Sequence, residues 1–436
     1  MLKGISRSKP SGIVVLVTAV VLVFGFAACG PVEEGSSGSS GNSDTTTTTY
    51  TQENILQISS AAELKAFADR VNNGESFENR HIKLTNNIDL KGIAWTPIGH
   101  DYYKPFRGYF DGDGKTIFNL DISGRYVYDT VGLFGYIFYG EVKNLGLENA
   151  NINGYEYVGA VAGYLDSSSV SNCRVTGPGT IKGDWYVGGV AGAVLMNSRV
   201  SDCHVASTVK GGSYVGGVAG MVINSGSSVS NCHVAGNVIS EGNYIGGVAG
   251  FIEEGGSVRN CYAAGVVRGI QYIGGVAGSV IDGSVINCYA TGYLGGYNFV
   301  GGIAGSVVSS LSGNVAGCSA LNPAIERTLD VPSSVNFGRV AGYADVDTLI
   351  SNVAWNNMWV VNAAMTQAIT SRHYGINGQG ITKEDATRQG SYITYPLPWN
   401  IGNNNPWKWG GIGYPLPILY WQTEAQIPAS LPEHLR

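Results

Sequence analysis

A short glycine-rich string recurs six times between residues 158 and 305, and this repeat limits the possible folds more than any other feature. It reads VGAVAG at 158–163, VGGVAG at 187–192 and 215–220, IGGVAG at 245–250 and 273–278, and VGGIAG at 300–305. Successive copies start 29, 28, 30, 28 and 27 residues apart. A regular period between about 20 and 50 residues is the signature of a solenoid, in which each repeat packs on its neighbours.

A second string follows each of the first five copies and ends in cysteine. The five cysteines are Cys173, Cys203, Cys232, Cys261 and Cys288, and Cys318 marks a degenerate sixth copy. Looser copies of the first string stand at 131–135 and 337–342. Each unit holds three β-biased runs joined by Gly, Ser and Asn corners, without helical periodicity. We therefore predict an all-β chain that forms a parallel β-solenoid, a right-handed β-helix with about 28 residues per coil.

One corner of each repeat carries Asn or Asp, residue types that tolerate a left-handed backbone and bond to their own main chain. These corners are expected to stack as a side-chain ladder through Asn172, Asp202, Asn231, Asn260 and Asn287. Beyond the corner, Cys and Val share one parity and should point inward. The opposite parity should point outward, and it supplies Arg174 and the candidate binding residues His204, His233, Tyr262 and Tyr289.

The glycine-rich string has no polar residue on either parity, so it is buried on both faces or its glycines allow very close backbone contact. An aromatic residue precedes each copy, giving a second set of candidate binding residues: Tyr157, Tyr186, Tyr214, Tyr244, Tyr272 and Phe299. This column forms either an internal aromatic stack or an exposed face on which sugar rings stack. The residues alone do not decide between the two.

The cysteine ladder is expected to hold reduced thiols. Neighbouring coils stand about 4.8 Å apart, but straight stacking aims their side chains in parallel, which is unfavourable for disulfides. We expect buried thiols that act as small apolar residues. The chain shows no Cys/His spacing typical of a metal site, so we predict neither a metal nor a cofactor.

The N-terminus is typical of an export signal. Lys3, Arg7 and Lys9 precede an apolar run over 13–26, which is followed by Ala27, Ala28 and Cys29. This arrangement resembles a bacterial lipoprotein signal, which implies cleavage before Cys29 and a diacylglycerol on its sulfur. The alternatives are an uncleaved membrane anchor and a plain secretory signal. Residues 30–49, rich in Gly, Ser and Thr, are expected to form a flexible tether.

The two ends of the array are expected to be capped. A short strand over 55–58 precedes Ser60 and Glu63, which fit a capping box, and an apolar stripe then predicts a helix that ends near Asn73. At the other end, residues 321–436 are rich in Trp and Pro and are typical of an irregular end cap. Within this part, Trp399, Trp407 and Trp409 either pack the cap or form a platform for glycans.

Composition and motifs narrow the functional classes. Charged residues make up 13% of the chain and the net charge is −6, without any basic run, so we expect no nucleic-acid partner. The sequence holds no HExxH, GxSxG or phosphate-loop motif, and the acids within the array are scattered over different repeat positions. We therefore predict no catalytic residues and no enzyme activity.

Taken together, the VGGVAG and SVSNC strings resemble the bacterial GLUG repeat. The segments at 61–74, 88–99 and 106–122 also resemble the region that often precedes such repeats in surface proteins, and the resemblance covers about 54–320 and, more loosely, 413–422. Similar repeats accompany immunoglobulin A proteases, but no protease residue carries over. The implied organisation is a signal peptide over 1–28, a lipidated tether over 29–53, a cap with first coils over 54–157, the repeats over 158–320 and a cap over 321–436.

These features predict a cell-envelope protein, anchored through an N-terminal lipid to the outer membrane or cell surface and monomeric. Its expected role is a non-catalytic, adhesin-like binding module for a glycan or a host surface protein. The alternatives are a structural envelope spacer without a specific ligand and, less favoured, a carbohydrate-active β-helix enzyme.

Overall fold

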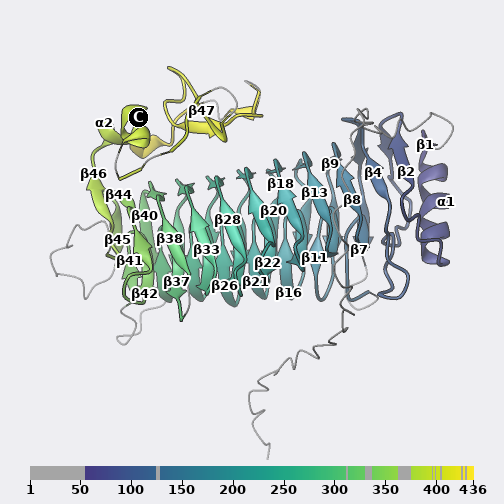
Figure 1. Ribbon diagram of the computed structural model, residues 1–436, viewed down its shortest axis with the longest axis horizontal. Helices are drawn as coiled ribbons and strands as arrows, with labels where there is room; N and C mark the ends of the chain where they lie inside the picture. The colour runs from purple at the N-terminus through teal and green to yellow at the C-terminus, as the bar shows by residue number, and fades with distance from the viewer. Residues whose placement is uncertain are drawn as a thin grey trace, which may run out of the picture. The chain divides into compact units, whose positions relative to one another are not determined.

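The computed structural model describes residues 55–123, 128–310, 313–328, 336–361, 375–394, 396–397, 399–402, 405–423, 426–427 and 430–436. Nearly all of the elements are short strands that wind into successive coils (Figure 1). One coil of the array holds five strands: β21 (Ser213–Gly216), β22 (Ala219–Ile223), β23 (Ser228–Ser230), β24 (His233–Val234) and β25 (Val238–Ser240). Each pairs in parallel with the equivalent strands of the coils before and after it.

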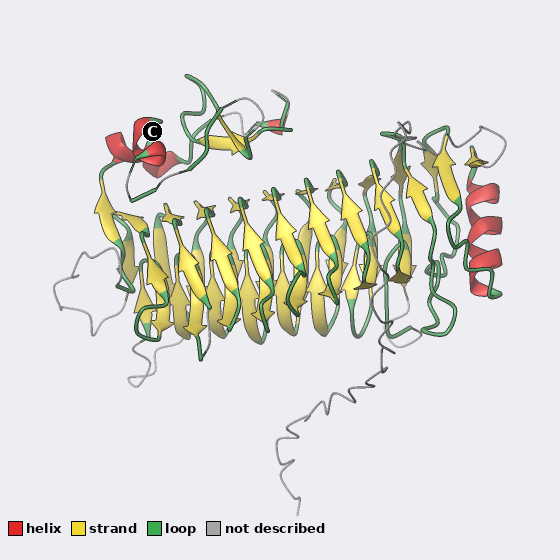
Figure 2. Cartoon of the chain, viewed as in Figure 1, coloured by secondary structure: helices red, strands yellow, loops and turns green. Residues whose placement is uncertain are grey.

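Parallel stacking of equivalent strands creates long sheets along the array (Figure 2). Five parallel sheets contain 11, 11, 9, 8 and 7 strands. In the sheet that contains β23, Val200 pairs with Val229 and Val229 with Val258. The structure confirms the predicted parallel β-solenoid, with about 10 turns of about 29 residues each. The right-handed sense stays a prediction.

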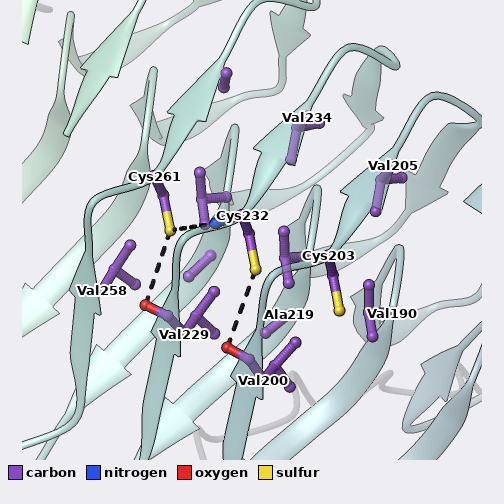
Figure 3. Packing of buried hydrophobic residues seen from close by; sticks show 14 of the residues in the cluster. Val190, Val200, Cys203, Val205, Ala219, Val229, Cys232, Val234, Val258 and Cys261 are labelled. Carbon is purple, nitrogen blue, oxygen red and sulfur yellow. Dashed lines mark hydrogen bonds between the residues drawn. The ribbon is translucent and has the colours of Figure 1, made fainter. Parts of the chain in front are cut away.

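The interior of each coil is filled by columns of small apolar side chains. Val200, Val229 and Val258 occupy one column, and the cysteines occupy another (Figure 3). Cys203, Cys232, Cys261, Cys288 and Cys318 are fully buried, and all six cysteines of the described residues are free thiols. The Cys232 thiol donates to the Ser230 carbonyl oxygen at 3.2 Å, while the Cys232 N–H donates to the Cys261 sulfur at 3.3 Å. The expected buried, reduced ladder is confirmed.

The predicted Asn/Asp corner is also present. The corner residues Asn172, Asp202, Asn231, Asn260 and Asn287 all adopt left-handed φ values between 49° and 56°. Their side chains bond from coil to coil, since the Asn231 amide donates to Asp202 at 3.2 Å and the Asn260 amide donates to Asn231 at 3.4 Å. Because the Asn231 amide both donates and accepts, it links the corners of the coils before and after it and satisfies polar groups at the bend of the chain.

The glycine-rich string is buried and also makes close backbone contact, so both expectations hold. Residues 187–192 are all buried. An added Cβ on Gly217 would overlap the carbonyl oxygen of Gly247 in the next coil, and one on Gly188 would overlap that of Ala191. These positions therefore require glycine because only a hydrogen atom fits between the backbones.

The N-terminal cap follows the sequence closely. Strand β1 (Ile55–Ile58) precedes helix α1 (Ala61–Asn72), in which Leu64, Phe67, Ala68 and Val71 are buried. The Ser60 hydroxyl accepts from the Glu63 N–H as predicted. The returning bond of the capping box runs from the Ser59 N–H to the Glu63 carboxylate at 2.6 Å, one residue earlier than expected.

The C-terminal part differs from a simple end cap. Strands β45 (Trp359–Val361) and β46 (Gln379–Ile381) still pair with the array. Beyond them the chain folds back along the side of the solenoid, through α2 (Lys383–Ala386), α3 (Gly390–Ile393), the hairpin β47 (Trp407–Trp409) and β48 (Pro417–Leu419), and η3 (Glu433–Leu435). We call residues 383–436 the flank segment. Its Trp399 indole donates to Gly317 at 2.6 Å, and its Trp421 indole donates to Asn231 at 2.9 Å.

The tryptophans of the flank segment serve packing. Trp399 and Trp407 are buried, and their rings stack 4.9 Å apart. Trp409 is half-buried and contacts the core from its edge. This arrangement favours the packing interpretation over the glycan platform, because buried indoles are not accessible to a sugar.

The predicted signal sequence, the lipidation of Cys29 and the tether lie outside the described residues. Within the described part of the chain, no helix has the length and apolar character that crossing a membrane requires.

Replacing Gly217 by alanine tests the backbone contact between coils. The new methyl group would overlap the Gly247 carbonyl oxygen, and overpacking of this kind costs about 1–3 kcal/mol. We expect Gly217→Ala to lower the urea midpoint of unfolding clearly. Gly390→Ala is the matched control, because its Cβ would meet no atom within 4 Å. Equal midpoints for the two variants would contradict the tight contact.

The thiol ladder can be tested by chemical labelling. Burial raises the pKa of Cys203 and of Cys232 well above the ordinary value of a thiol. In a chain that starts at residue 51, we expect no reaction of the native thiols with Ellman's reagent at pH 8. All six cysteines should react once urea unfolds the chain. Rapid labelling of the native protein would show that the ladder is accessible.

Candidate binding surface

The aromatic column lies on the outside of the coils as a continuous stack of half-buried rings. We call Tyr157, Tyr186, Tyr214, Tyr244, Tyr272 and Phe299 the aromatic stripe; all six are of intermediate exposure. Successive ring centroids are 5.0, 4.9, 4.8, 4.7 and 4.6 Å apart, with interplanar angles of 27° or less. The internal aromatic stack that the sequence left open is therefore wrong, and the rings present their edges along one side of the array.

The backbone conformation explains why the in-out alternation of side chains along a strand does not predict where these rings lie. Every member of the stripe has a left-handed φ, between 42° and 65°. This conformation is uncommon for a bulky residue and interrupts the in-out alternation of a strand. As a result, Trp185 and Tyr186 both reach the surface, where strict alternation would place them on opposite sides, and Val187 after them is buried. Six aromatic residues held in this conformation at equivalent positions indicate a geometry that the coil imposes.

A second outer row lies beside the stripe. It comes from equivalent positions of β12 (Ala162–Asp166), β17 (Ala191–Leu195), β22 and β27 (Ala249–Glu253). Here Ala193, Leu195 and Met221 form a small apolar cluster outside the coil, against which Tyr186 and Phe251 pack. Phe251 meets the rings of Tyr214 and Tyr244 edge-on at 5.5 and 5.6 Å. The surface thus combines flat rings with apolar side chains.

Hydroxyls and carboxylates border this surface. Burial raises the pKa values of Tyr186, Tyr214 and Tyr244 above the ordinary range, so these phenols stay protonated at neutral pH and both donate and accept hydrogen bonds. Burial also raises the pKa of Glu156 and of Glu253. The result is an amphipathic strip, apolar along the ring edges and the outer row of side chains and hydrogen-bonding at the hydroxyls and carboxylates.

The acids inside the array serve mainly as local hydrogen-bond acceptors. Asp282 accepts from the Ser310 N–H at 2.7 Å and from its hydroxyl at 2.9 Å. Glu254 accepts from the Asn224 amide at 2.8 Å. These contacts hold loops between coils, and they agree with the scattered placement of acids in the sequence.

The second predicted set of binding residues is covered. We call His204, His233, Tyr262 and Tyr289 the flank column; the side chains stack outside the coil with centroid separations of 4.8, 3.9 and 4.7 Å. They leave the coil on the outward parity, as predicted, but His233, Tyr262 and Tyr289 are at most 1% exposed. The flank segment covers them, because Gln422 accepts from the Tyr262 hydroxyl at 3.0 Å and the Pro417 carbonyl oxygen accepts from Tyr289 at 2.8 Å. An open binding face that includes His233, Tyr262 and Tyr289 is therefore excluded, whereas His204 is of intermediate exposure.

Sequence reasoning missed a cavity next to the first ring of the stripe. We call it the end pocket; it has a volume of about 210 Å³, and its lining includes Tyr102, Tyr103, Arg107, Tyr136, Tyr164 and Asp166. The aromatic-rich stretches YYKPF at 102–106 and YIFY at 136–139 were the available signal. They lie before the regular repeats, so the period of the repeats gave no reason to bring them together.

The repeats match a known family of sequence motifs. Residues 154–182, 241–268 and 269–292 match the family described as the GLUG motif. The chain is thus a GLUG-repeat protein, as the resemblance of its sequence indicated.

Two further proteins are similar to this chain. Halomucin from Haloquadratum walsbyi is 34% identical over 145 residues, which are 31% of this chain and 2% of halomucin, so the chain spans a small fraction of that relative. A proposed immunoglobulin A1 protease from Bacteroides ovatus has a crystal structure that superposes with a TM-score of 0.50 at 19% identity. That match covers 86% of this chain and 94% of the other. At this identity the likeness concerns the fold.

The buried histidine of the flank column predicts a pH dependence of stability. Burial, and then the charge of His204, lowers the pKa of His233 well below its ordinary value, and its Nε2 has no hydrogen-bond partner among the residues that the structure describes. As the pH falls below about 6.5, the unfolded chain takes up a proton before the folded chain does. The contribution of neutral His233 to the free energy of unfolding is therefore complete above about pH 6.5 and declines below it.

We expect the urea midpoint to fall between pH 7 and pH 5 and to stay nearly constant between pH 7 and pH 8. His233→Tyr places in this coil the residue that pairs with it in the next one, Tyr262. This variant should lose less stability on acidification than the wild type. An equal loss in both proteins would show that His233 is not responsible.

Proposed function

We propose that this GLUG-repeat protein is a lipid-anchored, non-catalytic binding module of the bacterial cell surface, and that the aromatic stripe holds a glycan. The observation that carries the proposal is the half-exposed stack of Tyr157, Tyr186, Tyr214, Tyr244, Tyr272 and Phe299 along one side of the solenoid.

The chemistry of the stripe favours saccharides. A sugar ring has apolar C–H faces that pack against aromatic ring edges and apolar side chains, and hydroxyls that bond to phenol and carboxylate groups. The stripe supplies both, since its phenols stay protonated and Glu156 and Glu253 stand beside it. The spacing of the rings follows the coil repeat, so the surface suits an extended ligand with many similar units better than a single compact one.

The cell-surface location rests on the N-terminal sequence and on the kinds of proteins that this chain resembles. The apolar run and Cys29 support export and lipid anchoring, with the membrane as a partner through the lipid. The similarity to halomucin and to the Bacteroides ovatus structure supports an extracellular setting. We propose a monomer, with a glycan or a host surface protein as the ligand.

A glycan and extracellular-matrix array probed with residues 51–436 tests this function. That part of the chain forms one compact unit. We expect reproducible binding that weakens by about fivefold or more in the Tyr214→Ala, Tyr244→Ala double variant, since each lost ring contact is worth about 0.5–1.5 kcal/mol. Tyr293→Ala is the matched control, because this half-exposed tyrosine lies off the stripe.

Circular dichroism should confirm that all variants are folded. A blank array, or binding that the double variant retains in full, would contradict the proposal. The structural spacer would then be the favoured function.

A further inference from the structure

The end pocket is a built cavity at one end of the aromatic stripe. Its floor comes from the outer face of β7 (Phe134–Phe138), which supplies Tyr136, and of β12, which supplies Tyr164 and Asp166. The loop that contains Tyr102 and Tyr103 forms one wall. The Phe106 N–H donates to the Tyr136 carbonyl oxygen at 3.0 Å, which fixes this loop to the strand.

The walls of the pocket are aromatic rings set at angles to one another. The rings of Tyr102 and Tyr136 meet edge to face at 5.6 Å, and Tyr136 and Tyr164 lie 5.4 Å apart. Tyr103 is 86% exposed and stands at the rim. A volume of about 210 Å³ is below the roughly 300 Å³ at which pockets for drug-sized ligands begin, so the cavity suits a single small ring.

Two charged groups give the pocket a donor and an acceptor. The Arg107 guanidinium lies over the Phe138 ring at 4.5 Å, and among the described residues it forms no ion pair. The Asp166 carboxylate accepts from the Ser167 hydroxyl through one oxygen, Oδ1. A guanidinium can donate to ligand hydroxyls, and the remaining carboxylate oxygen can accept from them.

The charges around the pocket disfavour an anionic ligand. The two lining charges, Arg107 and Asp166, balance each other. Nearby, Asp129 and Glu156 are close enough to add to the effect of burial in raising the pKa of Tyr136. A uronate, a sialate or a phosphorylated ligand would therefore meet net repulsion, whereas a neutral polyol ring would not.

The pocket is continuous with the stripe. Tyr164 lines the pocket and also meets Tyr157, the first ring of the stripe, edge to face at 5.3 Å. A ligand unit in the pocket would thus be followed directly by the rings of the stripe.

We infer that the end pocket binds one neutral pyranose ring, the terminal unit of a glycan whose following units lie along the aromatic stripe. The ring would stack on the tyrosines, donate hydroxyl protons to Asp166 and accept from Arg107. The placement of the remaining glycan units depends on the proposed function of the stripe, whereas binding of the single ring depends on the pocket alone.

Saturation-transfer NMR on the full chain in mild detergent tests the inference. The probes are methyl glycosides of glucose, galactose, mannose and N-acetylglucosamine, with glucuronic acid and N-acetylneuraminic acid as acidic comparisons. We expect saturable binding of at least one neutral glycoside and none of the acids. Tyr103→Ala and Asp166→Asn should each weaken this binding about tenfold, whereas Tyr293→Ala, which changes neither the pocket nor the stripe, should leave it unchanged.

The outcomes separate the two proposals. Failure of every neutral glycoside to bind, while a longer glycan binds and is lost in Tyr244→Ala, would overturn the pocket inference and leave the stripe intact. Equal binding by wild type and both pocket variants, or a preference for the acidic sugars, would also overturn it. Glycoside binding that depends on Tyr103 and Asp166, together with a blank array of longer glycans, would support the pocket and contradict the stripe.

Discussion

Close backbone contact between adjacent coils is the constraint on which the rest of this structure depends. Gly188, Gly217 and their equivalents leave no room for a Cβ between one turn and the next. This contact sets the coils in register, and the register in turn stacks every side chain on its equivalent. This register produces the valine and cysteine columns, the Asn ladder and the aromatic stripe. The same local requirement therefore acts in every coil of the array.

Register turns single residues into continuous surfaces. One tyrosine beside a glycine corner would be an ordinary surface residue, but in successive coils it becomes a stack with ring separations of 4.6 to 5.0 Å. The same stacking places His233 against Tyr262 at 3.9 Å. The difference between the two columns is what lies over them: the flank segment covers the second and leaves the first half-exposed.

The flank segment shows how a repeat protein can use its irregular end. It contacts coils far from it in the sequence, since the Tyr420 hydroxyl donates to Asp202 at 3.1 Å and the Trp421 indole reaches Asn231. Its Gln422 side chain and Pro417 carbonyl oxygen satisfy the hydroxyls of Tyr262 and Tyr289, which would otherwise be costly to bury. It thereby fixes which side of the solenoid stays open to a ligand.

The sequence by itself determined the solenoid, its period, the inward Cys and Val columns, the left-handed Asn corner and helix α1. Each of these depends on local chemistry repeated at a fixed spacing, which can be read from the chain directly. The direction of the aromatic stripe depended on a left-handed φ at Tyr186 and its equivalents, which breaks the alternation that sequence reasoning relies on.

Only the tertiary structure decided the burial of the flank column and the existence of the end pocket. Both arise where segments distant in the chain, such as Gln422 over His233 or Tyr103 beside Asp166, meet on the outer face of a coil. No repeat spacing relates these pairs, so their contact follows from packing in three dimensions.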